Sequence, residues 1–224
     1  MTEAQIFLAD QRGLSQTDTF RSFHTFNFGV YQAESRTPFG ALRLFNEDTL
    51  APKASLTMQV ETDTEAIILP IVLGVDVKVN SGLKEYVNAG ESFSFSLSAG
   101  EKYKIYNPFE EADELVNFLQ IWIQTPVKVE GHDRDYVFDL TQTNKLLFCS
   151  RRAVIGQFDG RQKGVYELQN SENGLFVFVI EGVFEVQDRL LHARDGLSLK
   201  NTPIVDFEAL SEDAILLLME IPLS

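Results

Sequence analysis

Hydrophobic and polar residues alternate along much of the chain, which is the pattern of half-buried strands. Residues 92–97 read SFSFSL, which places Phe93, Phe95 and Leu97 on one face and serines on the other. Residues 119–123 alternate in the same way. Because side chains two positions apart on a strand share a face, both segments are predicted to be strands. Apolar runs at residues 176–186 and 214–221 predict further strands.

Turn residues separate these runs at short intervals. Gly follows Asn, Asp or Ala at many of the breaks, as at Asp195-Gly196, and such pairs favour tight turns. Sustained helical periodicity is scarce. Many short strands joined by turns predict an all-β barrel or sandwich. Pro70 interrupts the apolar run of residues 66–73, so that run is predicted to be an edge strand or to contain a bulge.

The same order of features occurs twice. An apolar run ends at Gly74, an alternating run follows, and a turn leads to another strand at residues 92–97. In the second half an apolar run ends at Gly182, and a strand, a turn and the short strand of residues 197–199 follow. This repetition predicts a duplicated small barrel.

A polar stretch that contains Pro and Gly lies between Gln124 and Leu140. Domain boundaries usually fall in such segments. We therefore predict an N-terminal barrel at residues 1–130 and a C-terminal barrel at residues 131–224.

Composition narrows the possible partners. The net charge is −14 and the isoelectric point is near 4.6, which argues against nucleic acid and against anionic membrane surfaces. The N-terminus lacks the basic start and apolar stretch of a signal peptide, and no apolar run is long enough to span a membrane. The single Cys149 excludes an internal disulfide and fits a reducing compartment. We expect a cytoplasmic protein, whose oligomeric state the sequence leaves open.

Several blocks resemble the pirin family. They are SFHTFNFG at residues 22–29, GALRLFNED at residues 40–48 and LQIWI at residues 119–123. The resemblance covers almost the whole chain. It implies an all-β bicupin fold, in which two double-stranded β-helix, jelly-roll-like barrels pack face to face with few short helices.

The resemblance also implies a metal site, but this sequence lacks the residues that form that site in the family. Pirins usually bind one iron-type metal in the N-terminal barrel through three His and one Glu, and some members cleave flavonols such as quercetin with O₂. The chain has three histidines, His24, His132 and His192, and none lies where the family keeps its ligands.

Two of the ligand positions fall in residues 57–65, in one of two registers, and the other two lie just before Asn107. Neither register supplies the imidazoles that hold an iron-type ion with open coordination positions. We therefore expect no metal and no other cofactor. The residues at these positions are Gln59 with Glu61, or Val60 with Thr62, followed in either case by Tyr103 and Ile105.

Other titratable residues have two interpretations each. Glu61, Asp63 and Glu65 would share one face of a strand and could hold a hard cation, or they form a solvated acidic strand end. His24 is either a general base or a hydrogen-bonded histidine that orders the first strands, and Cys149 has the surroundings of a buried, inert thiol.

Three functions remain open at this stage. The first is a metal-free, non-catalytic bicupin that binds a small molecule or a protein partner, with Gln59, Glu61, Tyr103 and Ile105 as candidate pocket residues. The second is an enzyme, a quercetinase-type dioxygenase that uses ligands not recognised here. The third is a structural or interaction protein whose cups are filled by side chains. The fold alone does not choose among them.

Overall fold

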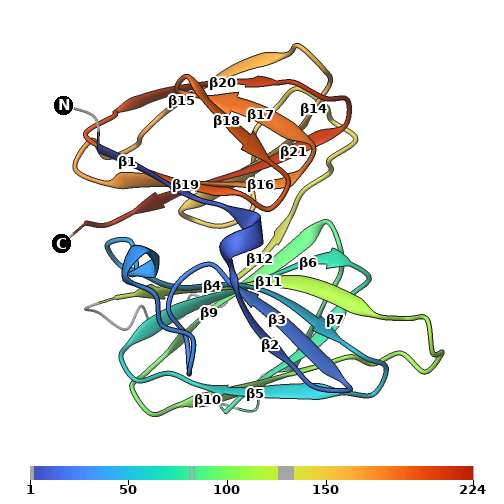
Figure 1. The fold of residues 1–224 in the computed structure, drawn as a ribbon. Coiled ribbons are helices and arrows are strands. Elements are labelled where there is room, and N and C mark those ends of the chain that lie inside the picture. Colours follow the sequence, from blue (N-terminus) through green and yellow to red (C-terminus); the bar gives the residue numbers. More distant parts are fainter. Residues whose placement is uncertain (1–2, 81, 83, 126–133, 224) are drawn as a thin grey trace. The chain divides into compact units, whose positions relative to one another are not determined.

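The computed structural model describes residues 3–80, 82, 84–125 and 134–223. The regular structure consists of strands and two short 3-10 turns within these ranges (Figure 1), which confirms the all-β prediction. No helix among the described residues is long and apolar enough to cross a membrane.

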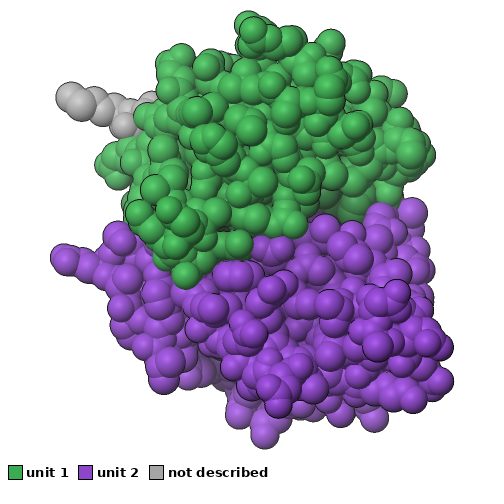
Figure 2. Space-filling model, turned by 45° about the vertical axis from the view of Figure 1, so that its right-hand side comes forward, with its two compact units in different colours: residues 1–12, 39–41, 138–224 green, residues 13–38, 42–137 purple. Residues whose placement is uncertain are grey.

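The chain forms two compact units (Figure 2). We call residues 13–38 and 42–137 the N-terminal unit, and residues 1–12, 39–41 and 138–224 the C-terminal unit. The first twelve residues are grouped with the second half because β1 (Glu3–Phe7) pairs antiparallel with β19 (Gly196–Lys200). The predicted boundary at residue 130 lies outside the described residues.

The N-terminal unit has a seven-stranded sheet, β12-β9-β6-β11-β4-β3-β2, and a four-stranded sheet, β5-β10-β7-β8. Its elements are β2 (Gly13–Gln16), β3 (Phe20–His24), η2 (Glu34–Arg36), β4 (Leu42–Leu50), β5 (Ser55–Gln59), β6 (Thr64–Val72), β7 (Val75–Val79), β8 (Lys84–Val87), β9 (Glu91–Leu97), β10 (Lys102–Tyr106), β11 (Val116–Gln124) and β12 (Arg134–Val137).

The C-terminal unit has a six-stranded sheet, β1-β19-β16-β21-β14-β13, and a four-stranded sheet, β15-β20-β17-β18. Besides β1 and β19, its elements are η1 (Ala9–Gln11), β13 (Leu147–Phe148), β14 (Ala153–Phe158), β15 (Lys163–Glu167), β16 (Gly174–Glu181), β17 (Val183–Val186), β18 (Arg189–His192), β20 (Ile204–Ala209) and β21 (Ala214–Ile221).

The two units repeat one topology. The order β9-β6-β11-β4 in one matches β19-β16-β21-β14 in the other, and β5-β10-β7-β8 matches β15-β20-β17-β18. The duplication predicted around Gly74 and Gly182 is therefore present. Gly182 has a φ of +78°, a conformation that side chains with a Cβ rarely adopt.

Pro70 lies in a central strand, not in an edge strand. β6 is hydrogen-bonded to β9 on one side and to β11 on the other. The register of β6 against β11 shifts so that Asn117 faces Val72 while Phe118 faces Pro70, which leaves Ile71 as an extra residue. The bulge accommodates a residue that has no N–H to donate.

Each unit has its own apolar core. In the N-terminal unit the core includes Phe93, Phe95 and Leu97 of β9, which were predicted to share an inward face. Valines of β7 and Val116 and Phe118 of β11 fill the same interior. Apolar side chains thus occupy much of the inside of this barrel.

Candidate functional site

A layer of polar side chains lies inside the otherwise apolar N-terminal barrel. Along β4 the inward positions alternate as Leu44, Asn46, Asp48 and Leu50, and all four are buried. Strand pairing places Asp48 between Ser22 of β3 and Phe118 of β11. Alternation that builds the core therefore also brings a carboxyl into it.

Hydrogen bonds connect this carboxyl to the neighbouring strands. Gln120 Nε2 on β11 donates to Asp48 Oδ2 at 3.1 Å, and Tyr103 Oη on β10 donates to Gln120 Oε1 at 2.7 Å. The indole Nε1 of Trp122 donates to Tyr103 Oη at 2.6 Å. Asp48, Gln120 and Tyr103 are each at most 1% exposed, so the chain of bonds is shielded from water until it reaches Trp122.

Burial changes the acid–base properties of this layer. Loss of hydration disfavours the carboxylate and raises the pKa of Asp48 to about 7, with a further rise from Glu47 and an opposing hydrogen bond from Ser22. Burial likewise raises the pKa of Tyr103 well above its usual value, so the phenol stays neutral. Asp48 is thus a group that titrates near neutral pH inside the barrel.

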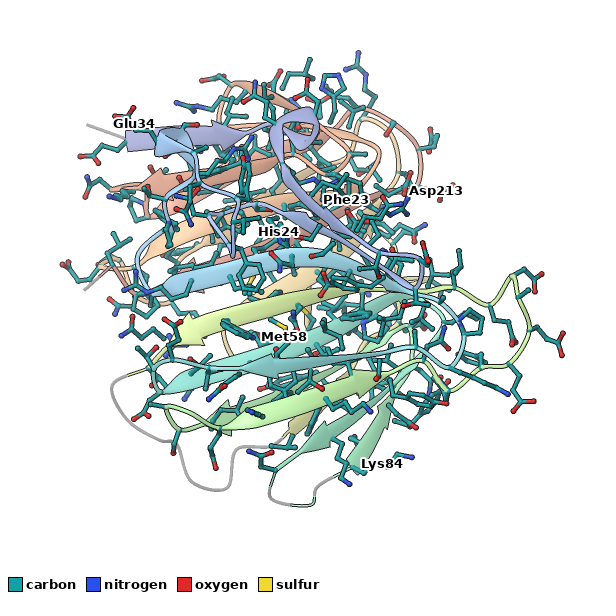
Figure 3. All side chains as sticks on the ribbon, turned by 60° about the horizontal axis from the view of Figure 1, so that its bottom comes forward. Phe23, His24, Glu34, Met58, Lys84 and Asp213 are labelled. Carbon is teal, nitrogen blue, oxygen red and sulfur yellow. The ribbon has the colours of Figure 1, made fainter. Side chains whose placement is uncertain are left out.

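His24 lies at the other end of the polar layer. Its Nδ1 is 3.3 Å from Ser22 Oγ and its Nε2 is 2.8 Å from Ser15 Oγ. Burial lowers the pKa of His24, so the ring is neutral near pH 7. These contacts tie β2 to β3, which agrees with the interpretation of His24 as an ordering residue. Figure 3 labels His24 on β3 and Met58 on β5.

A pocket of about 720 Å³ opens beside this layer, within the N-terminal unit. Its lining includes Leu44 and Met58, which are buried in the core, and the aromatic residues Trp122 and Phe28, which pack against that core and which we call the pocket walls. The ring of Phe28 lies 5.0 Å from that of His24. Both ends of the polar layer therefore reach a wall of the pocket.

The four candidate pocket residues separate into two pairs. Gln59 and Glu61 are exposed and line the pocket, where Gln59 Nε2 donates to the Gly100 carbonyl at 3.1 Å. Tyr103 and Ile105 point into the barrel and are buried in its core. Tyr103 reaches the pocket only through Trp122.

The residues at the family's metal positions do not fit an iron-type ion. Val60 is buried and apolar, Ile105 has no donor atom, and the hydroxyl of Tyr103 is engaged by Gln120 and Trp122. Within the described ranges, no group of three or more His, Cys, Asp and Glu side chains is placed to hold a metal ion. Neutral imidazoles, which such ions favour, are lacking at every one of these positions.

Glu61, Asp63 and Glu65 do not share one face of a strand. Residues 60–63 form a bend between β5 and β6, so Glu61 is exposed whereas Glu65 is buried in β6. Asp63 Oδ1 accepts a hydrogen bond from the backbone N–H of Ala99. The solvated interpretation is the one that agrees with this geometry for Glu61.

The remaining candidates lie away from this site. Cys149 is buried in the C-terminal unit and burial raises the pKa of its thiol, as expected for an inert cysteine. His192 is exposed at the end of β18. His132 lies outside the described residues.

Sequence reasoning missed Asp48, Gln120 and Trp122 as site residues. All three are in blocks that carry the family resemblance, GALRLFNED and LQIWI. Two polar residues at inward positions of apolar strands were a usable signal, because a buried polar side chain needs partners.

We expect Tyr103→Phe to lower the free energy of unfolding by about 1–3 kcal/mol, since it leaves the buried Gln120 oxygen without its donor. Urea unfolding followed by circular dichroism measures this. Tyr106→Phe on the same strand is the matched control, with an expected loss below about 0.5 kcal/mol. Equal losses in the two variants would contradict the hydrogen bond's role.

The comparisons with known proteins agree with this architecture. Residues 150–221 match the model of the quercetinase C-terminal cupin domain. The Escherichia coli K12 protein named quercetin 2,3-dioxygenase is 25% identical in an alignment of 223 positions that covers 93% of this chain and 95% of that protein. A pirin-like protein of Caulobacter vibrioides is 26% identical over 94% of this chain and 96% of its own length.

Solved structures are similar over the full length. The crystal structure of YhhW from Escherichia coli superposes with a TM-score of 0.83 at 22% identity and covers 98% of both chains. A structure described as bacterial pirin YhhW in complex with nickel(II) has a TM-score of 0.80 at 21% identity, and covers 98% of this chain and 99% of that one.

Two repeated β-barrel units of this topology define a two-domain cupin. Over almost its whole length the chain is similar to pirin-like proteins and bacterial pirins of this fold.

Proposed function

We propose that the N-terminal unit binds a small, flat, aromatic molecule in its pocket, without a metal ion and without catalysis. The pocket wall carries this proposal. The aromatic side chains of Trp122 and Phe28 line the pocket together with the apolar side chains of Leu44 and Met58. Aromatic rings stack on one another with offset or tilted geometry, and small ligands are usually held in mostly apolar concave sites.

Polar groups around the pocket support a ligand that carries oxygen or nitrogen substituents. Thr57, Gln59 and Asn27 line the pocket with groups that donate and accept hydrogen bonds. Arg43 Nε donates to Gln124 Oε1 at 2.7 Å on the same rim. The net charge of −14 argues against a polyanionic ligand.

An oxygenase is the second candidate, suggested by relatives that are named quercetin 2,3-dioxygenases. Neither Gln59 with Glu61 nor Val60 with Thr62 supplies an imidazole beside Tyr103 and Ile105. These side chains do not fit the ion that such chemistry would use, so we derive no oxygen chemistry for this chain. The filled interior of the barrel also suits a protein that binds only another protein. The pocket favours a small ligand, and we propose that it acts in the cytoplasm.

Prodan, an uncharged aromatic ketone whose emission reports its surroundings, is a suitable probe. We expect saturable binding accompanied by quenching of Trp122, the single tryptophan. Thr57→Phe, which fills the pocket from β5, should weaken binding at least about tenfold. Ser55→Phe on the same strand is the control and should bind normally. Absence of saturable binding, or equal weakening in both variants, would overturn the proposal.

A further inference from the structure

The polar layer of the N-terminal barrel is not a requirement of the fold. The strand of the C-terminal unit that corresponds to β4 is β14, AVIGQF, which carries no acidic residue. Its neighbour β21 corresponds to β11 and places Leu216 and Leu218 in the core of that unit. The buried carboxyl of β21, Glu220, lies near the end of the strand and accepts hydrogen bonds from Tyr166 Oη and the Gln169 N–H. The same topology thus forms with apolar residues in the centre of both strands, although burying a carboxyl there costs free energy. The layer in the N-terminal barrel therefore calls for a functional explanation.

We propose that Asp48 is a proton-binding site that controls the pocket: the ionised carboxylate holds the pocket walls in their binding arrangement, and uptake of a proton from solvent weakens ligand binding. This inference rests on the proposed function, because it assigns a regulation to the same pocket.

Two lines of contact carry the effect from Asp48 to the pocket. The first runs through Gln120 and Tyr103 to the indole N–H of Trp122, with donor–acceptor distances of 3.1, 2.7 and 2.6 Å. The second runs through the Ser22 hydroxyl to His24, whose ring lies 5.0 Å from that of Phe28. Trp122 and Phe28 are the two aromatic walls of the pocket.

The order of donors and acceptors from Asp48 to Trp122 determines which protonation state of Asp48 favours ligand binding. A carboxylate only accepts hydrogen bonds, so it orients the Gln120 amide with its N–H toward Asp48 and its oxygen toward Tyr103. That oxygen takes the phenol hydrogen, which leaves Tyr103 Oη free to accept from Trp122. A protonated carboxyl is a weaker acceptor and no longer enforces this order. The ionised state is the one that fixes the indole ring.

The pKa of Asp48 lies in the range in which a change of pH near neutrality can control the pocket. Burial raises its pKa to about 7, and its Oδ1 has no hydrogen-bond partner among the described side chains and backbone groups. The titratable groups around it are Tyr103 on β10, His24 on β3 and Glu47 on β4. Tyr103 and His24 are neutral near pH 7, because burial raises the first pKa and lowers the second. Burial therefore favours the uncharged form of both groups.

The test uses Trp122 as an internal reporter, without any ligand. Its fluorescence is expected to titrate with a midpoint near pH 7 in the wild-type chain and to be flat in Asp48→Asn. Tyr103→Phe should also remove the titration of Trp122. In that variant the Asp48 carboxyl, followed by carbon-13 NMR, should still titrate. His192→Gln, an exposed histidine in the other unit, is the control and should leave the curve unchanged.

Prodan affinity provides the second measurement. We expect binding about fivefold tighter at about pH 8 than at about pH 6, which corresponds to a ligand-induced fall of about one unit in the Asp48 pKa. The ratio should approach one in Tyr103→Phe. Trp122 fluorescence that stays flat in the wild-type chain, or that titrates unchanged in Asp48→Asn, overturns the inference.

The two measurements can refute the binding function and its regulation by Asp48 independently of each other. If Trp122 titrates through Asp48 but prodan does not bind at any pH, the proposed ligand function is wrong and the linkage between Asp48 and Trp122 stands. If prodan binds equally well at both pH values and Trp122 does not titrate, the regulation is wrong and the binding function stands.

Discussion

Phe95→Ala is expected to lower the free energy of unfolding by about 4 kcal/mol, because it opens a cavity in a filled core. Phe95 is 1% exposed, and its ring centroid lies 5.1 Å from those of both Phe93 and Tyr103. A barrel interior packed in this way has few vacant sites into which neighbours can relax. Urea unfolding followed by circular dichroism gives the difference.

Phe148→Ala is the matched control for this variant. Phe148 is 57% exposed, so its loss should change the free energy of unfolding by less than about 1 kcal/mol. A small effect of Phe95→Ala, similar to that of the control, would mean that the interior is a loose ligand cavity. In that case the ligand site would lie within the barrel, not in the pocket beside it.

Asp48→Asn is expected to stabilise the protein above about pH 7. The pKa of Asp48 is raised in the folded chain to about 7 from an ordinary value of 3.8, so the folded state binds the proton more tightly than the unfolded state. The wild-type carboxyl therefore contributes stability that is fully present below about pH 4 and is lost as the pH rises through about 7. The asparagine variant loses this dependence.

The difference in the free energy of unfolding between the wild-type chain and Asp48→Asn isolates the contribution of the Asp48 carboxyl. A shift of about three units corresponds to a contribution on the order of 4 kcal/mol, most of which should appear between about pH 4 and about pH 7. Asp113→Asn, at an exposed position, should show no such trend. A stability difference that does not change with pH would show that Asp48 is ionised in the folded state throughout this range.

Most of the fold was predictable because it depends on patterns that repeat along the chain. The alternation of Phe93, Phe95 and Leu97 identified β9 and its inward face, and the positions of Gly74 and Gly182 identified the duplication. The assignment of residues 1–12 to the C-terminal unit was not predictable, since it depends on the pairing of β1 with β19, nearly two hundred residues away along the chain.

The candidate site was only partly predictable. The family positions led to Tyr103 and Ile105, and alternation on β10 explains why both point inward. Gln59 and Glu61 line the pocket, but Gln59 is on the outward side of β5 and the inward position is Val60 after the strand ends. The link from Tyr103 through Gln120 to Asp48 joins three strands far apart in sequence, so no local pattern contains it.

The metal content of the purified protein tests the central claim most directly. After expression in media supplemented with iron, nickel or manganese, elemental analysis is expected to find far less than one metal ion per chain in every case. About one ion per chain, retained through dialysis and lost on substitution of Glu61 or Tyr103, would contradict the account and would restore an oxygenase-type site to the N-terminal barrel.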